Sequence, residues 1–237
     1  GDDGCGDLNC DGWPDLVFTG YHDDTSWTTD SYIYYGSATG YSASDRLALP
    51  TNGAWDVKVQ DIDDDGYVDL LFPSAREDSS YASDSRVYWG SAAGYSASDA
   101  TDLSSSGSVD ACVGDIDQDG YNDIVLPGYY DGNYSVTSSI YWGSSGGYSG
   151  ANVTDFVNYG VRDCEIEDLN QDGYPDLVFA TYYDGNDATN STIYWGSSTG
   201  IDTADITSLP AYRTPRITLA DVDEDGWTDI LMPNYYD

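Results

Sequence analysis

The chain has 237 residues, of which 43 are acidic and 7 are basic, so its formal net charge is −36. A surface this acidic repels phosphate backbones and anionic lipid headgroups, which argues against binding to nucleic acid or to a membrane surface. No apolar run approaches the ~20 residues that a membrane span needs, so we expect no membrane insertion. The chain has one His and one Lys, His22 and Lys58, so general bases and Schiff-base amines are scarce. We therefore expect a protein that is not an enzyme. An aromatic content of 14% argues equally against a disordered acidic tail.

A nine-residue acidic segment recurs five times along the chain. The copies, which we call Asp loops 1 to 5, occupy residues 7–15, 61–69, 115–123, 168–176 and 221–229. A second segment, Tyr-Tyr-Gly-Ser or Tyr-Trp-Gly-Ser, follows the first four loops at residues 34–37, 88–91, 141–144 and 194–197. The period of about 53 residues suits a four-stranded β unit. We treat residues 1–237 as one domain with repeats at 1–53, 54–107, 108–160 and 161–213 and a half repeat at 214–237.

Each repeat predicts four β-strands. A short alternating segment precedes the Asp loop, as at 56–59 and 216–219. A second strand begins at the last Asp of the loop and is apolar throughout, which predicts burial on both faces; the copies are 15–18, 69–72, 123–126, 176–179 and 229–232. A third strand carries the Tyr-Trp-Gly-Ser segment, as at 86–89. A fourth, more polar strand follows near 46–49, 101–103, 153–157 and 205–209. No segment predicts a helix, so the fold class is all-β.

The Asp loops have the pattern of a calcium-binding loop. Positions 1, 3 and 5 carry short oxygen donors, Gly at position 6 permits a sharp turn, the carbonyl of position 7 points inward, and Asp at position 9 completes the set. Hard oxygen ligands without His or Cys favour Ca²⁺ over zinc or copper. The simpler alternative, an Asp-Gly hairpin turn, explains one loop better than five identical ones. An EF-hand needs Glu at position 12 and flanking helices, whereas position 12 here is apolar.

On these loops, and on the Tyr-Trp-Gly-Ser strands with their Gly-Tyr turns, the chain resembles FG-GAP/VCBS-type repeat proteins, the family whose Ca²⁺-loop blades also build the integrin α propeller. The resemblance implies a β-propeller of four-stranded blades, each with a Ca²⁺ loop between its first and second strands, and about five Ca²⁺ ions per chain. The side-chain ligands that it implies are Asp7, Asn9, Asp11, Asp15, Asp61, Asp63, Asp65, Asp69, Asp115, Asp117, Asp119, Asp123, Asp168, Asn170, Asp172, Asp176, Asp221, Asp223, Asp225 and Asp229. The position-7 carbonyls belong to Trp13, Tyr67, Tyr121, Tyr174 and Trp227.

The number of blades stays open. Integrin propellers have seven blades, whereas this chain offers four full repeats and 23 further residues, 215–237, which align with residues 1–23. Three alternatives follow: a ring of about five blades, part of a larger ring, or assembly between chains through open blade edges, because unpaired strand edges are adhesive.

The four cysteines form two candidate disulfides. Cys5 and Cys10 are close in sequence, and Cys112 and Cys164 occupy equivalent segments of neighbouring repeats. The alternative for each pair is buried free thiols. Disulfides fit an extracellular compartment.

Loops that follow the second strands carry Tyr with Asp or Asn, which suits carbohydrate binding because flat rings stack on sugars and amides bond their hydroxyls. The candidate glycan contacts are Tyr130, Asp131, Asn133, Tyr183, Asp184 and Asn186. The alternative is that these tyrosines pack between blades. Sequons at Asn133, Asn152 and Asn190 permit N-glycosylation.

These observations predict a secreted or cell-surface, calcium-stabilised β-propeller that acts as an extracellular structural, adhesion or assembly module. Its partners would be an extracellular protein, a glycan or further copies of the chain. A lectin-like carbohydrate-binding propeller is the alternative. An accessory domain of a polysaccharide-degrading enzyme is a third hypothesis, which the shortage of catalytic bases disfavours.

Overall fold

The computed structural model describes residues 6–185 and 188–235. Within these residues it contains strands and no helix, and it is divided into two compact units, Gly1–Gly107 and Ser108–Asp237. The boundary between the units falls between the second and third predicted repeats. The described residues therefore contain no helix that could cross a membrane.

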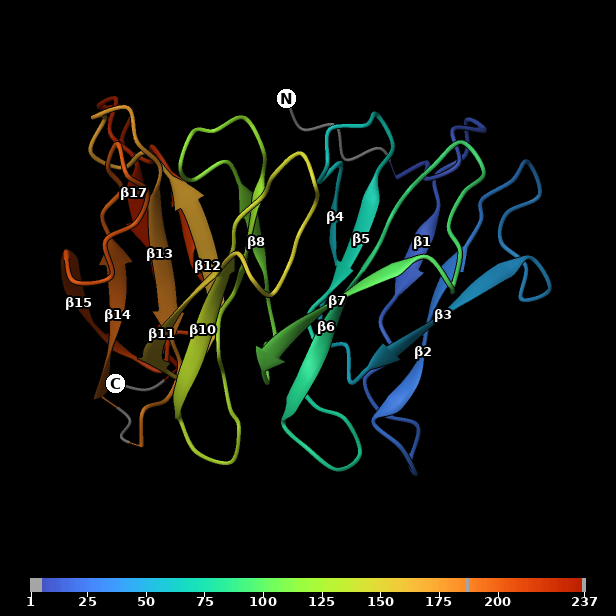
Figure 1. Ribbon diagram of the computed structural model, residues 1–237, viewed down its shortest axis with the longest axis horizontal. Coiled ribbons are helices and arrows are strands. Elements are labelled where there is room, and N and C mark those ends of the chain that lie inside the picture. Colours follow the sequence, from blue (N-terminus) through green and yellow to red (C-terminus); the bar gives the residue numbers. More distant parts are fainter. Residues whose placement is uncertain (1–5, 186–187, 236–237) are drawn as a thin grey trace. The chain divides into compact units, whose positions relative to one another are not determined.

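The first unit contains two antiparallel sheets in which consecutive strands pair (Figure 1). The first sheet contains β1 (Leu16–Phe18), β2 (Thr28–Tyr34) and β3 (Arg46–Asn52). The second contains β4 (Lys58–Gln60), β5 (Asp69–Phe72), β6 (Ala82–Tyr88) and β7 (Ala100–Ser106).

The second unit contains three sheets of the same antiparallel type. The third sheet contains β8 (Cys112–Gly114), β9 (Asp123–Leu126), β10 (Ser135–Tyr141) and β11 (Val153–Tyr159). The fourth contains β12 (Val161–Glu167), β13 (Asp176–Thr181), β14 (Ala188–Tyr194) and β15 (Ile206–Tyr212). The fifth contains β16 (Thr218–Ala220) and β17 (Asp229–Leu231).

The all-β prediction is confirmed for the described residues, and Asp loops 2 to 5 join the first strand of a sheet to its second. The third and fourth strands are longer than the sequence patterns predicted. In the second sheet they pair over seven residues, from Ala82 opposite Ser106 to Tyr88 opposite Ala100. Their outer halves are polar and alternate between exposed and buried positions. A search for apolar runs therefore finds only part of each strand.

Neighbouring sheets within a unit pack face to face through equivalent apolar residues of each repeat. In the first unit, Leu70, Phe72 and Tyr88 on one face of the second sheet pack against Ile33 and Leu49 of the first sheet. In the second unit, the third and fourth sheets bury one apolar cluster, and the fourth and fifth sheets bury another. Within a unit, consecutive sheets thus bury apolar residues of their second strands against each other.

The predicted burial of the second strands on both faces holds for β5, β9 and β13 and is wrong for β1 and β17. All four residues of β5 are buried, whereas Phe18 in β1 is 53% exposed and Leu231 in β17 is 42% exposed. β1 belongs to the first sheet along the chain and β17 to the last, so an apolar sequence alone does not determine whether a second strand is buried.

Candidate metal centres

Every Asp loop has the same unusual backbone. The glycine at position 6 has φ between 90° and 93° in all five loops, as the sequence led us to expect. The residue at position 4 also has positive φ, between 57° and 61°, although it is never glycine. These residues are Cys10, Asp64, Gln118, Gln171 and Glu224. The left-handed region is costly for most side chains, so five such residues show that the loop geometry overrides local preference.

Hydrogen bonds from the loop's own amides orient the carboxylates. In Asp loop 2, Asp61 accepts from the backbone N–H of Asp65 at 3.1 Å through Oδ1 and from that of Gly66 at 2.9 Å through Oδ2. The same pair of bonds recurs in the other four loops. The carboxylate at position 1 is therefore held against the turn in all five loops.

Three of the loops gather three carboxylates at one point. The groups, in each of which one oxygen per residue lies within 4.8 Å of the others, are Asp61, Asp63 and Asp69; Asp115, Asp117 and Asp123; and Asp221, Asp223 and Asp225. In loops 1 and 4, Asn9 and Asn170 stand at position 3 and donate to the position-5 carboxylates at 3.1 and 3.0 Å. Oxygen donors alone, without a His or Cys, are the set that Ca²⁺ prefers.

The electrostatics of these groups favour a bound cation. The pKa of Asp69 is raised to about 6, mainly by burial; backbone hydrogen bonds oppose the rise, and the charges of Asp63 and Asp61 add to it. Asp123 behaves in the same way, with its pKa raised to about 6. Burial also raises the pKa of Asp63 and of Asp117, and neighbouring carboxylates add to the effect. A divalent cation between the carboxylates would offset both costs.

The Asp at position 9 ties its loop to the third strand. Asp69 Oδ1 accepts from Gly90 N at 2.7 Å, and its Oδ2 accepts from Ile62 N at 2.8 Å. A Cβ at Gly90 would collide with the carbonyl oxygen of Val68. The glycines of the other Tyr-Trp-Gly-Ser and Tyr-Tyr-Gly-Ser segments make the same bond and the same close approach. Sequence reasoning missed this role, although the recurrence of this segment at a fixed distance from each loop was its signal.

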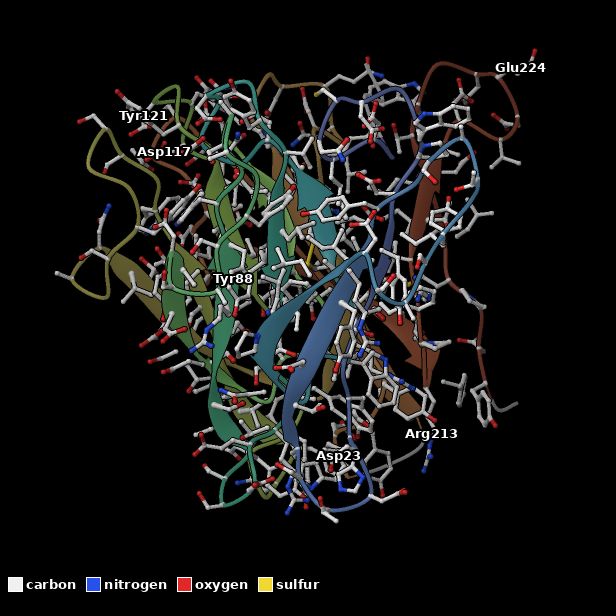
Figure 2. The ribbon with its side chains drawn as sticks, turned by 90° about the vertical axis from the view of Figure 1, so that its right-hand side faces the viewer. Asp23, Tyr88, Asp117, Tyr121, Arg213 and Glu224 are labelled. Atoms are coloured by element: carbon white, nitrogen blue, oxygen red, sulfur yellow. A yellow bond between two sulfur atoms is a disulfide. The ribbon has the colours of Figure 1, made fainter. Side chains whose placement is uncertain are left out.

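Aromatic residues around the loops also had roles that the sequence did not predict. Tyr95 and Tyr148, from the turns after the third strands, donate through their hydroxyls to the position-8 carbonyls of loops 2 and 3, each at 2.6 Å. The position-7 residues, to which we assigned only a carbonyl, have exposed side chains in four loops. In Figure 2, Tyr121 lies beside Asp117 at one end of the second unit, and Arg213 lies toward the opposite end.

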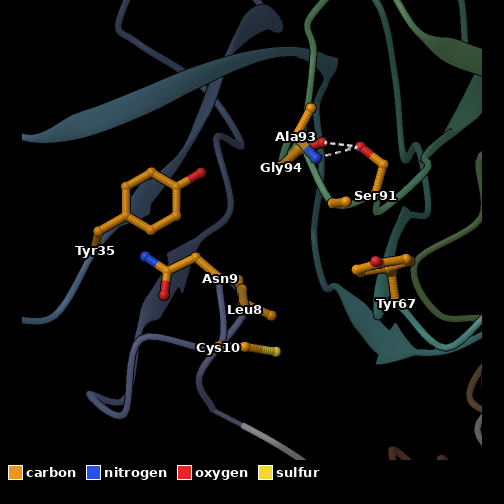
Figure 3. A pocket seen from close by; sticks show the side chains of 9 residues that line it. Leu8, Asn9, Cys10, Tyr35, Tyr67, Ser91, Ala93 and Gly94 are labelled. Atoms are coloured by element: carbon orange, nitrogen blue, oxygen red, sulfur yellow. Dashed lines mark hydrogen bonds between the residues drawn. The ribbon is translucent and has the colours of Figure 1, made fainter.

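A hollow of about 500 Å³ separates Asp loop 1 from the second sheet (Figure 3). Cys10 and Asn9 line it from loop 1, Tyr67 lines it from loop 2, and Ser91 and Gly94 line it from a turn. Cys10 stands at position 4 of its loop and is exposed with a free thiol. Its predicted disulfide partner, Cys5, lies outside the described residues.

The second candidate disulfide is present. Cys112 of the third sheet and Cys164 of the fourth are joined, with their Cα atoms 6.0 Å apart. Beside this disulfide, the backbone N–H of Cys164 donates to Asp110 Oδ2 at 3.2 Å. Burial and a hydrogen bond to Asp163 raise the pKa of Asp110 to about 8, so Asp110 keeps its proton at neutral pH.

The candidate glycan contacts lie after the second strands, β9 and β13. The rings of Tyr130 and Tyr183 each lie 4.7 Å from the ring of Tyr134, and the guanidinium of Arg213 lies 4.5 Å from the ring of Tyr183. All three tyrosines are half-buried. Asp131 and Asn133 are exposed, Asp184 is half-buried, and Asn186 lies outside the described residues. The sequon residues Asn133, Asn152 and Asn190 are exposed.

The chain resembles known proteins over most of its length. Residues 168–232 match the FG-GAP-like repeat family. Integrin alpha-6 from Homo sapiens is 30% identical over 152 residues, which cover 59% of this chain and 13% of the integrin. Integrin alpha-6 from Gallus gallus is 32% identical over 151 residues, which cover 57% of this chain and 14% of the integrin. The chain thus matches about one seventh of the length of these relatives.

A solved structure shares the fold. The V. cholerae biofilm matrix protein Bap1 superposes with a TM-score of 0.53 at 15% sequence identity. The match covers 96% of this chain and 33% of the other. At this identity the likeness concerns the fold alone.

Proposed function

The chain is an FG-GAP-type repeat protein with integrin-alpha-like repeats, and from this premise we propose that it is a calcium-stabilised β-propeller module with a structural, adhesive or assembly role outside the cell. The observation that carries the proposal is the repeated gathering of three carboxylates within 4.8 Å. These oxygens suit Ca²⁺, and the same loop geometry in all five copies favours a scaffold role over a sensor.

In each loop, the side-chain oxygens at positions 1, 3, 5 and 9 and the carbonyl at position 7 would hold the ion; position 3 is a carboxylate in loops 2, 3 and 5 and an amide in loops 1 and 4. A bound Ca²⁺ supplies positive charge that cancels the repulsion between these carboxylates. Hydrogen bonds within the chain orient the ligands. The position-1 Asp stays oriented by the amides of positions 5 and 6, and the position-9 Asp anchors the loop to the third strand.

The expected stabilisation is large. Extracellular calcium modules commonly bind with Kd near 10⁻⁴–10⁻³ M, so at about 2 mM Ca²⁺ each site adds roughly 0.7–1.8 kcal/mol to the free energy of unfolding. Five independent sites then add about 3–9 kcal/mol, which is comparable with the whole stability of an ordinary domain. A module of this kind would be folded and functional only where Ca²⁺ is abundant, as it is outside cells.

Metal analysis tests the proposal. Protein dialysed against a calcium buffer should retain about five Ca²⁺ per chain, and loops 1 and 4 should release theirs first, because Asn9 and Asn170 each replace a carboxylate. Retention of fewer than three ions would refute the assignment of the loops. Sedimentation of the same samples would report whether the chain is a monomer or assembles with further copies, as expected if open blade edges pair between chains.

A carbohydrate-binding role is the second proposal. It rests on the placement of Tyr130, Tyr134 and Tyr183 side by side with Arg213, because aromatic rings are common sugar platforms. Contacts among the rings themselves favour the packing alternative. Loss of binding on a glycan array by Tyr130→Ala and Tyr183→Ala, with Tyr159→Ala unaffected, would establish the carbohydrate role, and absence of binding by the unaltered protein would refute it.

A further inference from the structure

Two glutamines connect consecutive Asp loops of the second unit. Gln118, at position 4 of loop 3, donates from Nε2 to the carbonyl oxygen of Gly173, at position 6 of loop 4, at 2.5 Å. Gln171, at position 4 of loop 4, makes the same bond to Gly226 of loop 5 at 2.6 Å. Both bonds span 55 residues, so they repeat with the period of the chain.

Each of these bonds joins the metal-binding parts of two loops. Gln118 lies between Asp117 and Asp119, which are candidate ligands of loop 3. Its acceptor belongs to the peptide between Gly173 and Tyr174, and the N–H of that peptide donates to Asp172 at 2.9 Å. Gln118 therefore holds a peptide that orients a ligand of loop 4.

The backbone at position 4 aims these side chains. Gln118 and Gln171 have φ of 60° and 58°, in the left-handed region that side chains rarely adopt. Neither side chain is needed for burial, because both residues are exposed. A second bond joins loop 5 to the strand that precedes loop 4, since Thr228 Oγ1 donates to Glu167, the last residue of β12, at 2.8 Å.

We propose that Gln118 and Gln171 couple the cation sites of Asp loops 3, 4 and 5, so that occupation of one loop raises the Ca²⁺ affinity of the next. The inference rests on the proposed function, because it requires the loops to bind Ca²⁺. An ion bound in loop 3 would restrict the backbone on both sides of Gln118. The hydrogen bond from Gln118 to loop 4 would then cost less conformational entropy. The peptide of loop 4 is then held before its own ion arrives.

Linkage requires that the coupling be reciprocal: occupation of loop 4 must raise the affinity of loop 3 by the same factor. A single hydrogen bond is worth roughly twofold to tenfold in an equilibrium constant, which sets the size of the effect.

The test is hydrogen–deuterium exchange of the whole chain during a Ca²⁺ titration, with protection read separately in peptides that span each loop. In Gln118→Met, which keeps the length and charge of the side chain and removes its donor, the protection midpoint of loop 4 should move to about twofold to tenfold higher Ca²⁺. The midpoint of loop 2 should not change. An unchanged midpoint in loop 4, or an equal shift in all five loops, would overturn the proposal.

Position 4 of loop 5 offers a matched control. Glu224 makes no hydrogen bond to another described residue. Glu224→Gln and Glu224→Met, which differ by the same amide as Gln118 and its variant, should therefore have equal midpoints. A difference between them as large as that at position 118 would mean that side-chain polarity, rather than the link to the next loop, sets the affinity.

The reciprocal experiment separates coupling from local damage. Asp172→Asn, which weakens loop 4, should raise the midpoint of loop 3 in the unaltered background and leave it unchanged in Gln118→Met. Equal shifts in both backgrounds would contradict the coupling. If no loop gains protection with Ca²⁺ in the unaltered protein, the proposed function itself fails. Normal protection without these shifts removes only the coupling.

Discussion

Asp loops 1 and 2 in the first unit and loops 3 and 4 in the second have the same backbone and differ in what lies between them. Gln118 bridges loops 3 and 4 through a hydrogen bond to Gly173. At the same position of loop 1, Cys10 is too short to bridge, and it lines a hollow of about 500 Å³ instead. The nine-residue pattern thus determines each loop, while a position outside the ligand set decides whether neighbouring loops are joined.

The largest difference between the units is covalent. The Cys112–Cys164 disulfide closes a separation of 52 residues in the second unit, and removal of a cross-link of this span costs about 4 kcal/mol. Cys112→Ser with Cys164→Ser should therefore destabilise the second unit by about that amount, measured by denaturant unfolding. Hydrogen exchange should show that the double variant opens more readily than the unaltered chain at β12, with little change at β5. An equal increase in opening in both units would mean that the disulfide does not stabilise the second unit selectively.

Substitution of a loop glycine should have the next largest effect. Gly120 has φ of 92°, and a Cβ added there would meet no heavy atom within 4 Å, so only the backbone conformation opposes a larger residue. Gly120→Val should lower the free energy of unfolding by about 2–4 kcal/mol, as strain and one lost ion add together. Gly66→Val, at the same φ in the first unit, should lose one ion at a similar cost. An unchanged melting temperature and ion count would contradict the assigned turn.

The second unit should also have its own pH dependence. The pKa of Asp110 is raised to about 8 by burial and by Asp163, so the folded chain binds a proton that the unfolded chain releases near pH 4. This contribution is fully present below about pH 4 and is lost as the pH rises toward 8. Asp110→Asn should therefore raise the free energy of unfolding by about 1–2 kcal/mol at pH 7.

The pH effect is best measured by chemical unfolding between pH 5.5 and 8 at saturating Ca²⁺. The difference between Asp110→Asn and the unaltered chain should grow with pH. Asp84→Asn, which alters an exposed carboxylate, is the control and should follow the unaltered chain. A difference that stays constant across this pH range would show that Asp110 is ionised in the fold.

The smallest predicted effect comes from placing a glutamine at position 4 of loop 1, as in loops 3 and 4. Cys10→Gln should extend an amide into the hollow and bond to the carbonyl of Gly66, which is equivalent to Gly173. One hydrogen bond should stabilise the first unit by about 0.5–1.5 kcal/mol and lower the Ca²⁺ midpoint of loop 2. Cys10→Met fills similar space without the donor, so an equal gain from both variants would attribute the effect to packing.

The sequence predicted the parts of this structure that depend on neighbouring residues. The Asp loops, the apolar second strands and the order of strands follow from spacing and residue type, since both are local properties. Contacts between residues that are far apart in the sequence were not predicted. Examples are the glutamine bridges, the bond from Gly90 to Asp69, and the hydrogen bond between Asp110 and Asp163, because each requires knowing which residues the fold places side by side.

The exposure of β1 and β17 was mispredicted for a related reason. Their apolar sequences match that of β5, but burial depends on a neighbouring sheet rather than on the strand itself. Phe72 and Phe18 occupy equivalent positions in consecutive repeats and are 1% and 53% exposed. A repeat pattern therefore predicts a strand and its apolar character, whereas the burial of that strand also depends on which other segments the fold packs against it.

The central claim is that Ca²⁺ in the Asp loops stabilises the fold, and thermal unfolding with and without a chelator at neutral pH tests it most directly. At about 2 mM Ca²⁺ the ions should add roughly 3–9 kcal/mol. Chelation should then lower the melting temperature by more than about ten degrees or unfold the chain, and Mg²⁺ should restore little of the loss. A melting temperature within about three degrees of its starting value in excess chelator would contradict the claim and leave the Asp loops as simple turns.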